Sequence, residues 1–218
     1  MAVTGGTVLI EVSPGETRAA TLEHDGRLVG LEVERLGDAP VTGAVRLGRV
    51  TRVEPGMGAA FVEIGEDQPG FLGKMRDVTE GEAAIVQIIR PAGGGKGAVL
   101  TAAPVVGGRY LSLTPDRPGI HWPQRWPGDR AAMTAVLEPI SPPDSGLAPR
   151  PRAADADAAT LRREAEHLAA VWAGVRDRAA RARPPAELQP APRLVDRVLR
   201  DAEGPVVIDD PREYSRIK

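Results

Sequence analysis

The chain contains no cysteine. This absence excludes a disulfide framework, a catalytic thiol and any zinc site built on cysteine ligands. No apolar run approaches the roughly 20 residues that a membrane-spanning helix needs. The first residues also lack the basic start and apolar stretch of a secretory signal. We therefore expect a cytoplasmic protein with no membrane partner.

Aromatic residues make up only 3% of the chain, and two of them are phenylalanines. Neither sign of charge is in large excess, because 28 Lys and Arg face 30 Asp and Glu for a formal charge of −2. This balance excludes a uniformly basic nucleic-acid coat but permits a local basic patch. The 25 glycines and 21 prolines exceed average usage and predict many turns. A chain of 218 residues is long enough for one domain or two small ones.

Residues 7–34 predict a three-strand meander. Apolar and polar residues alternate over 28–34, and Pro14-Gly15 marks the first turn. Asp25-Gly26 is a strong signal for a hairpin with a two-residue turn. Three strands of this length need another element to pack against.

Residues 43–101 predict a small closed barrel. Short apolar segments follow one another between turn-rich stretches, and Gly48 interrupts the first of them. The expected strands are 44–53, 59–64, 71–72, 83–90 and 98–101. Five short strands with a glycine kink are typical of an OB-type barrel.

The rest of the chain mixes loops and helices. Residues 104–160 look loose, with a strand candidate at 110–113, a short helix at 131–137 and extended chain at 150–152. An apolar stripe over 161–175 has helical spacing, with Asp155 or Asp157 as its cap. Beyond Pro184-Pro185, which stops this helix, we expect a helix at 193–200, a strand at 206–208 and no further element. The fold class is therefore α+β.

Phe61 is the most informative position for function. In residues 60–64, Ala60, Val62 and Ile64 share the face that suits a core, so Phe61 shares the outer face with Glu63. Outward aromatic rings on an OB surface stack on nucleic-acid bases. Phe71 is a candidate second platform on the same face. The alternative is that Phe61 covers a neighbouring domain.

Basic residues near these rings are candidate phosphate contacts. Lys96 lies in Gly93-Gly94-Gly95-Lys96-Gly97, where flanking glycines allow a phosphate to approach, although a solvated hairpin tip is an equal alternative. Arg46 and Arg52 lie six residues apart on one strand, which predicts a shared face. Arg150 sits in a proline-flanked loop that can hold a guanidinium against a phosphate.

Candidate catalytic groups are few. The three histidines are isolated along the sequence and are expected at the surface. Asp209 and Asp210, with Glu213, have the types of side chain that hold Mg²⁺. Pro211 indicates a turn, however, and favours a capping role for the two aspartates. No Ser-His-Asp set or acid–base carboxylate pair is identified.

The segment Gly48–Gly65, followed by Gly70-Phe71-Leu72, closely resembles the S1 RNA-binding domain of the ribonuclease E/G family. Lys96–Thr101 and Gly108–Leu111 resemble the segments that come next in that family, and Val12–Arg18 resembles its opening strand and turn. The later helices and the Val207–Pro211 segment follow in the family's order. The resemblance extends over essentially the whole chain.

This resemblance implies a domain order. Residues 1–42 would begin an RNase H-like subdomain, and residues 43–104 would form an inserted S1/OB barrel. Residues 105–185 would form a 5′-sensor-like region with a helix, and residues 186–218 would return to the RNase H-like part.

The resemblance also implies site residues. Phe61, Phe71 and Lys96 match RNA-contacting positions, and Arg150 matches the arginine that grips a 5′ monophosphate. Pro151 stands where the family has a threonine, so that hydroxyl is missing here. Relatives hold a catalytic Mg²⁺ in a DNase I-like subdomain that has no counterpart in these residues. We therefore assign no catalytic residue, metal ligand or cofactor to this chain.

Three functions follow as alternatives. The first is single-stranded RNA binding within a ribonuclease E/G-type endoribonuclease that acts in RNA processing or decay. The others are a non-catalytic RNA-binding regulator and a protein-interaction module. The expected partner is single-stranded RNA, with a second copy of the chain or a full-length ribonuclease as candidate protein partners.

Overall fold

The computed structural model describes residues 6–37, 41–73 and 78–217. The chain folds into two compact units. The first unit combines Met1–Pro40 with Pro192–Lys218, and the second is Val41–Ala191. No helix in the described residues is long and apolar enough to span a membrane.

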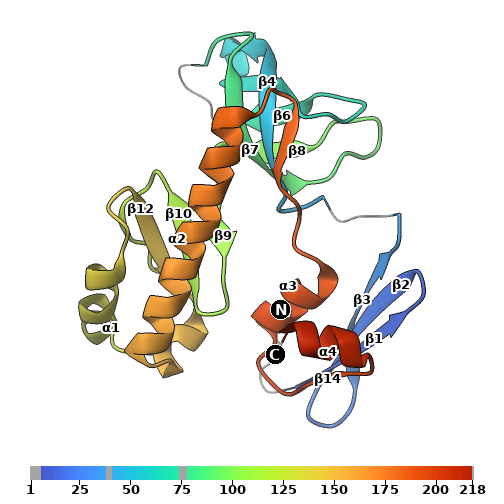
Figure 1. Cartoon of the computed structure of the whole chain (residues 1–218), viewed down its shortest axis with the longest axis vertical. Helices are drawn as coiled ribbons and strands as arrows, with labels where there is room; N and C mark the ends of the chain where they lie inside the picture. Colours follow the sequence, from blue (N-terminus) through green and yellow to red (C-terminus); the bar gives the residue numbers. More distant parts are fainter. Residues whose placement is uncertain (1–5, 38–40, 74–77, 218) are drawn as a thin grey trace. The chain divides into compact units, whose positions relative to one another are not determined.

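The first unit is a four-stranded sheet with helices (Figure 1). Its meander, β1 (Thr7–Ser13), β2 (Glu16–Leu22) and β3 (Leu28–Arg35), is confirmed. The strand β14 (Val206–Ile208) adds parallel to β1, giving the order β14-β1-β2-β3. The predicted two-residue turn at Asp25-Gly26 is wrong. The backbone N–H of Glu23 donates to the carbonyl oxygen of Arg27, so the hairpin closes around a longer loop.

The core of this unit forms only when the two chain ends meet. Val8, Ile10 and Ala19 of the meander pack against Leu194, Val195 and Val198 of α3 (Leu194–Asp201). Glu34 of β3 accepts a 2.7 Å hydrogen bond from the backbone N–H of Leu194, so a distant strand caps this helix. The meander therefore finds the packing partner that it needs about 160 residues later in the chain.

The C-terminal segment also contains a helix that the sequence analysis did not predict. α4 (Pro211–Ile217) begins directly after the strand β14. The Asp210 carboxylate accepts a 2.7 Å hydrogen bond from the backbone N–H of Glu213, which confirms the capping role. Asp209 instead accepts from the backbone N–H of Val12 at 2.9 Å, which ties β14 to the meander.

The predicted barrel is confirmed as a closed five-strand barrel of the described residues, consistent with an OB type. Its strands are β4 (Val45–Glu54), β5 (Ala59–Glu63), β6 (Gly70–Gly73), β7 (Ala83–Arg90) and β8 (Val99–Thr101). They pair in the order β4-β5-β6-β8-β7, and a β4–β7 pairing closes the ring. Gly48 is required because a Cβ there would lie 2.4 Å from a methyl group of Val62. A short 3₁₀ turn at Pro55–Met57 joins β4 to β5.

Residues 104–160 are more ordered than expected. They form a second sheet of β9 (Val106–Gly107), β10 (Leu111–Pro115), β11 (Gly119–Ile120) and β12 (Ser145–Pro149), in the order β11-β12-β10-β9. The helix α1 (Arg130–Leu137) and the 3₁₀ turn Glu138–Ile140 come between β11 and β12. The candidate strand at 110–113 is confirmed in β10. The other three strands escaped prediction because they are short and contain glycine or proline. Of the extended chain expected at 150–152 only Arg150 is extended, because a 3₁₀ turn begins at Pro151 and runs to Asp155.

The long helix α2 (Ala158–Arg181) joins the second sheet to the barrel. Asp157 caps it by accepting from the backbone N–H of Thr160 at 2.7 Å, which selects the second of the two predicted caps. Its apolar face, including Trp172, packs in one core with strands of the second sheet and with Val45 and Leu47 of β4. Figure 1 shows α2 running beside β9 and β10. After α2, β13 (Ala186–Gln189) pairs with β4, so the second unit ends at Ala191.

Candidate nucleic-acid interface

The five strands of the barrel each contribute one side chain to a row on its outer surface. Phe61 on β5 is the register partner of Phe71 on β6, and their rings meet edge to face with centroids 6.0 Å apart. Arg52 on β4 is paired with Phe61, and its guanidinium carbon lies 4.5 Å from the centre of that ring. On the other side, Phe71 is paired with Val99, and Val99 with Arg90. The row Arg52–Phe61–Phe71–Val99–Arg90 therefore has a cation at each end; we call it the aromatic row.

Both arginines reach this row through β-bulges. The register of β4 shifts between Val50 and Arg52, and that of β7 shifts between Ile88 and Arg90. Val50 and Ile88 point into the barrel core, and without a bulge the residues two positions later would point there too. The extra residue in each strand turns the following arginine outward.

Phe61 and Phe71 lie outside the three apolar cores of the described residues. Both side chains are half-buried rather than covered. Phe61 thus lies on the outer face that the alternation predicts, and no neighbouring element of the described unit covers it. A pair of accessible rings beside cations is the arrangement on which nucleic-acid bases stack.

The glycine-rich hairpin lies next to Phe71. Gly93 and Lys96 exchange two backbone hydrogen bonds, 3.0 and 3.1 Å long, around Gly94 and Gly95. Both central glycines have positive φ, +60° and +74°, which is the tight hairpin turn that favours glycine. Lys96 is exposed at the base of this turn.

Gly97 fixes the hairpin against the barrel. A Cβ at Gly97 would lie 2.0 Å from the carbonyl oxygen of Pro69, so only glycine allows this approach. A groove of about 720 Å³ lies between the hairpin and the phenylalanines, and Phe61, Phe71, Arg90 and Lys96 contribute to its walls. The structure therefore brings together Phe61, Phe71, Lys96 and Arg52 from the sequence-predicted residues, and adds Arg90. A bulge is not visible in the sequence, so Arg90 was missed.

The six-residue spacing predicted that Arg46 and Arg52 share a face, and this prediction is wrong. Arg46 is paired with Val86, whose side chain belongs to the barrel core, whereas Arg52 is paired with Phe61 outside. The bulge after Val50 reverses the alternation between them. Arg46 forms a 3.0 Å ion pair with Glu187 of β13 instead.

Arg150 lies in a different part of the second unit. Its Nη1 donates to the carbonyl oxygen of Gly108 at 3.0 Å, and its backbone N–H donates to Tyr110 at 2.8 Å. Pro151 directly follows it at the start of the 3₁₀ turn, and offers neither a hydroxyl nor a backbone N–H.

The loop beside Arg150 is organised by a carboxylate of α2. Glu164 accepts three consecutive backbone N–H groups, from Arg109 at 2.6 Å, Tyr110 at 2.8 Å and Leu111 at 2.7 Å. Successive N–H groups converging on one point form an anion-binding concavity, and here a side chain of the protein itself fills it. A Cβ at Gly108 would lie 2.7 Å from the Glu164 carboxyl carbon, so glycine is needed at this position.

The acidic residues near the C-terminus do not fit a Mg²⁺ site. Asp209 and Asp210 each accept from a backbone N–H. Glu213 is buried and bound to Arg216 at 2.6 Å, with Arg193 3.4 Å away. In the described part of the chain, no group of three or more His, Asp or Glu side chains is arranged to hold a metal ion.

Comparison with known proteins shows similarity to one family over nearly all of the chain. The family model of the Ribonuclease E/G family matches residues 106–218. Ribonuclease G of Haemophilus influenzae is 31% identical over 222 residues, which cover 90% of this chain and 45% of that protein. Ribonuclease G of Escherichia coli K12 is also 31% identical, over 89% of this chain and 45% of the relative.

Ribonuclease E of Haemophilus influenzae is 29% identical over 97% of this chain and 26% of its own length. The chain thus spans about half the length of the ribonuclease G relatives, and a smaller part of ribonuclease E. The family model covers more than half of the chain, and the relatives extend the similarity across nearly all of it. This chain belongs to the ribonuclease E/G family.

Proposed function

We propose that this chain binds single-stranded RNA on its barrel, as the RNA-holding part of a ribonuclease E/G-type endoribonuclease. The aromatic row is the observation that carries this proposal. Bases stack on Phe61 and Phe71, and the cations at the two ends of the row attract the phosphates on either side. Lys96 adds a third cation beside the groove.

The spacing of these groups suits a single strand better than a duplex. An aromatic ring can stack on a base only when that base is unpaired and turned toward the protein. The row crosses all five strands of the barrel, so its rings and cations lie side by side across the sheet. We therefore expect sequence-tolerant binding, since every base has a face on which a ring can stack.

Arg150 is proposed as the residue that faces a 5′ phosphate. Its guanidinium is oriented by the Gly108 carbonyl, and its planar donor fork suits a phosphate. Pro151 removes two donors at the neighbouring position, so we expect only a small preference for 5′-monophosphorylated RNA.

The proposal is tested by titrating the protein into a labelled single-stranded RNA, with a duplex of the same sequence as the control. We expect binding to the single strand that strengthens as the salt concentration falls. Equal binding to the duplex, or no dependence on Phe61, would contradict the proposal. Adding Mg²⁺ to the same samples and following the RNA length separates binding alone from cleavage, and so separates a regulator from an enzyme.

Homo-oligomerisation, pairing with a full-length ribonuclease and a cytoplasmic location stay predictions. Light scattering of the purified chain, alone and with a ribonuclease G, tests the first two. Fractionation of cells that produce the chain tests the third.

A further inference from the structure

The end of α2 carries a concentration of positive charge in a chain whose formal charge is −2. Arg176, Arg178, Arg181 and Arg183 lie within eight residues, all are exposed, and Asp177 is the one acidic residue among them. Basic side chains near a helix C-terminus interact favourably with its carbonyl groups. Arg178 instead directs its guanidinium to a carbonyl oxygen outside the helix.

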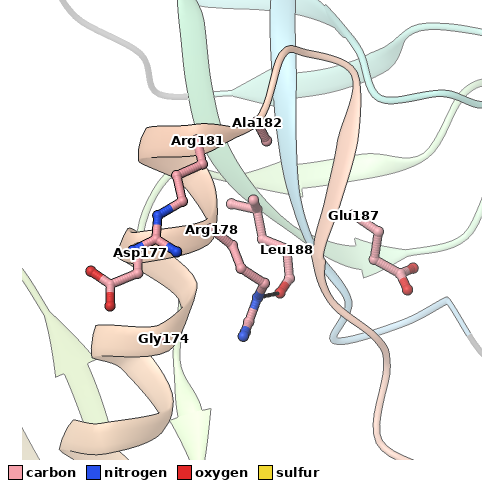
Figure 2. Close-up of a pocket in the computed structure, with 7 residues that line it drawn as sticks. All are labelled: Gly174, Asp177, Arg178, Arg181, Ala182, Glu187 and Leu188. Carbon is pink, nitrogen blue, oxygen red and sulfur yellow. Dashed lines mark hydrogen bonds between the residues drawn. The ribbon is translucent and has the colours of Figure 1, made fainter.

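Arg178 is held in place by the facing strand. Its Nε donates to the carbonyl oxygen of Leu188 in β13, and Figure 2 shows this bond across a pocket of about 530 Å³ between α2 and β13. The bond uses the Nε side of the guanidinium and leaves the two Nη groups for another acceptor. A guanidinium fixed in this way is a planar two-pronged donor, which suits a phosphate.

Gly174 keeps those two nitrogens accessible. A Cβ at this position would lie 3.4 Å from Nη1 and 3.9 Å from Nη2 of Arg178. A larger side chain would therefore cover the donors. Glycine in a helix interior is unfavourable relative to alanine, so this position gives up helix stability and leaves the guanidinium open.

Two arginines and two carboxylates line the pocket, and one of the carboxylates is shared with a further arginine. Glu187, on the opposite wall, is paired with Arg46 at 3.0 Å. Asp177 lies on α2, and Figure 2 shows Arg181 extending along the helix toward it. With Arg46 included, three arginines face two carboxylates at the pocket, which leaves it a net positive charge.

The pocket and the aromatic row belong to the same unit and share β4. Ala186, next to the pocket, is paired with Leu47, whereas Phe61 is paired with Arg52. Five residues along a strand correspond to roughly 17 Å. The turn after β5 passes beside the chain that leaves α2, because a Cβ at Gly65 would lie 3.7 Å from Pro185.

We propose that the Arg178 pocket at the end of α2 is a second phosphate-binding site, which holds the backbone of an RNA strand that extends beyond the aromatic row. This inference rests on the proposed RNA-binding function and adds a second contact to it. The ligand is a phosphodiester group, so recognition there is independent of base sequence.

The experiment compares two labelled single-stranded RNAs, of about five and about 20 nucleotides, the shorter one within the length that a single OB barrel covers. We expect Arg178→Gln/Arg181→Gln to weaken binding of the long RNA only. Losing two phosphate contacts makes the negative slope of log K against log salt shallower by about 1.4 for a single strand. A fourfold rise in salt then weakens the wild type about sevenfold more than the variant. Arg162→Gln/Arg163→Gln, at the other end of α2, removes the same charge and is the matched control.

A second variant separates the pocket from long-range electrostatics. Gly174→Leu covers the Arg178 donors, keeps the charge and favours the helix, so we expect it also to weaken the long RNA alone. Unchanged binding of the long RNA by both variants, or an equal loss with the control, would overturn the second site. The Phe61-dependent binding of the short RNA would still support the proposed function in that case. A wild-type chain that binds neither RNA would overturn both.

Discussion

Arg52 lies over the ring of Phe61, with its guanidinium carbon 4.5 Å from the ring centre. The same guanidinium forms a 2.9 Å ion pair with Glu54, which holds it above the ring. The cation therefore stays beside the stacking surface in the absence of RNA, and the aromatic row is organised before it meets a ligand. Pre-organisation of this kind lowers the entropic cost of binding.

Replacing Phe61 with alanine removes one of the two stacking rings. We expect single-stranded RNA binding to weaken by roughly 1–3 kcal/mol. The fold should be retained because Phe61 belongs to none of the apolar cores of the described residues. Fluorescence anisotropy measures the affinity, and urea denaturation measures the stability. Tyr214→Ala removes an exposed ring of the first unit and should leave the affinity unchanged.

Arg90→Gln tests the arginine that the sequence analysis missed. Loss of one phosphate contact should make the negative slope of log K against log salt shallower by about 0.7. Arg162→Gln on α2 removes the same charge far along the chain and serves as the control. A salt slope that falls equally in both variants would mean that net charge, rather than the position of Arg90, governs binding.

Pro151→Thr restores the hydroxyl and the backbone N–H beside Arg150. A hydrogen bond to a charged group contributes about 1.5–3 kcal/mol, so the preference for a 5′-monophosphate over a 5′-hydroxyl should rise about tenfold or more. Binding of matched RNAs that differ only at the 5′ end measures this preference. Arg150→Gln in the Pro151→Thr background should abolish the gain, and a gain that persists would exclude Arg150 from the phosphate site.

Glu164→Ala should destabilise the second unit strongly. The substitution leaves the N–H groups of Arg109, Tyr110 and Leu111 without their shared acceptor. Unsatisfied donors in a partly buried loop cost about 3 kcal/mol in total or more. Urea denaturation measures the loss. Glu166→Ala, an exposed position on the same helix, should change stability little, and a comparable loss there would contradict the specific role of Glu164.

Asp157 predicts a pH-dependent contribution to α2. Hydrogen bonds from the backbone N–H and the hydroxyl of Thr160 hold the pKa of Asp157 below its ordinary value. Because the folded-state pKa is lowered, the stabilisation is present above about pH 4 and is lost as the pH falls through the folded-state value. Asp157→Ala should therefore lower the thermal midpoint at pH 7 and have less effect at pH 3. Asp157→Asn keeps an uncharged cap, so its midpoint relative to the wild type should improve on acidification.

Much of the local structure could be predicted because it depends on short-range patterns. Alternation along 28–34 and 59–64 indicated strands, and it placed Phe61 on the outer face. The spacing of apolar residues over 161–175 indicated α2, and Asp157 was one of two proposed caps. Of the second sheet only β10 was predicted, and the other strands were missed because they are too short, and too rich in glycine or proline, for a period to emerge.

The sequence by itself determined the meander, the barrel, the helices α2 and α3, the outward phenylalanine and the family resemblance, since each of these follows from residue type and local spacing. Tertiary structure decided which charged groups meet. The bulges that turn Arg52 and Arg90 outward depend on the strands opposite them, and the pairing of β13 with β4 gives Arg46 its partner Glu187. Glu34 caps α3, and Glu164 binds the Gly108–Leu111 loop, across long stretches of sequence. Such contacts form only when the chain is folded, because no local pattern specifies which distant backbone groups will lie within reach.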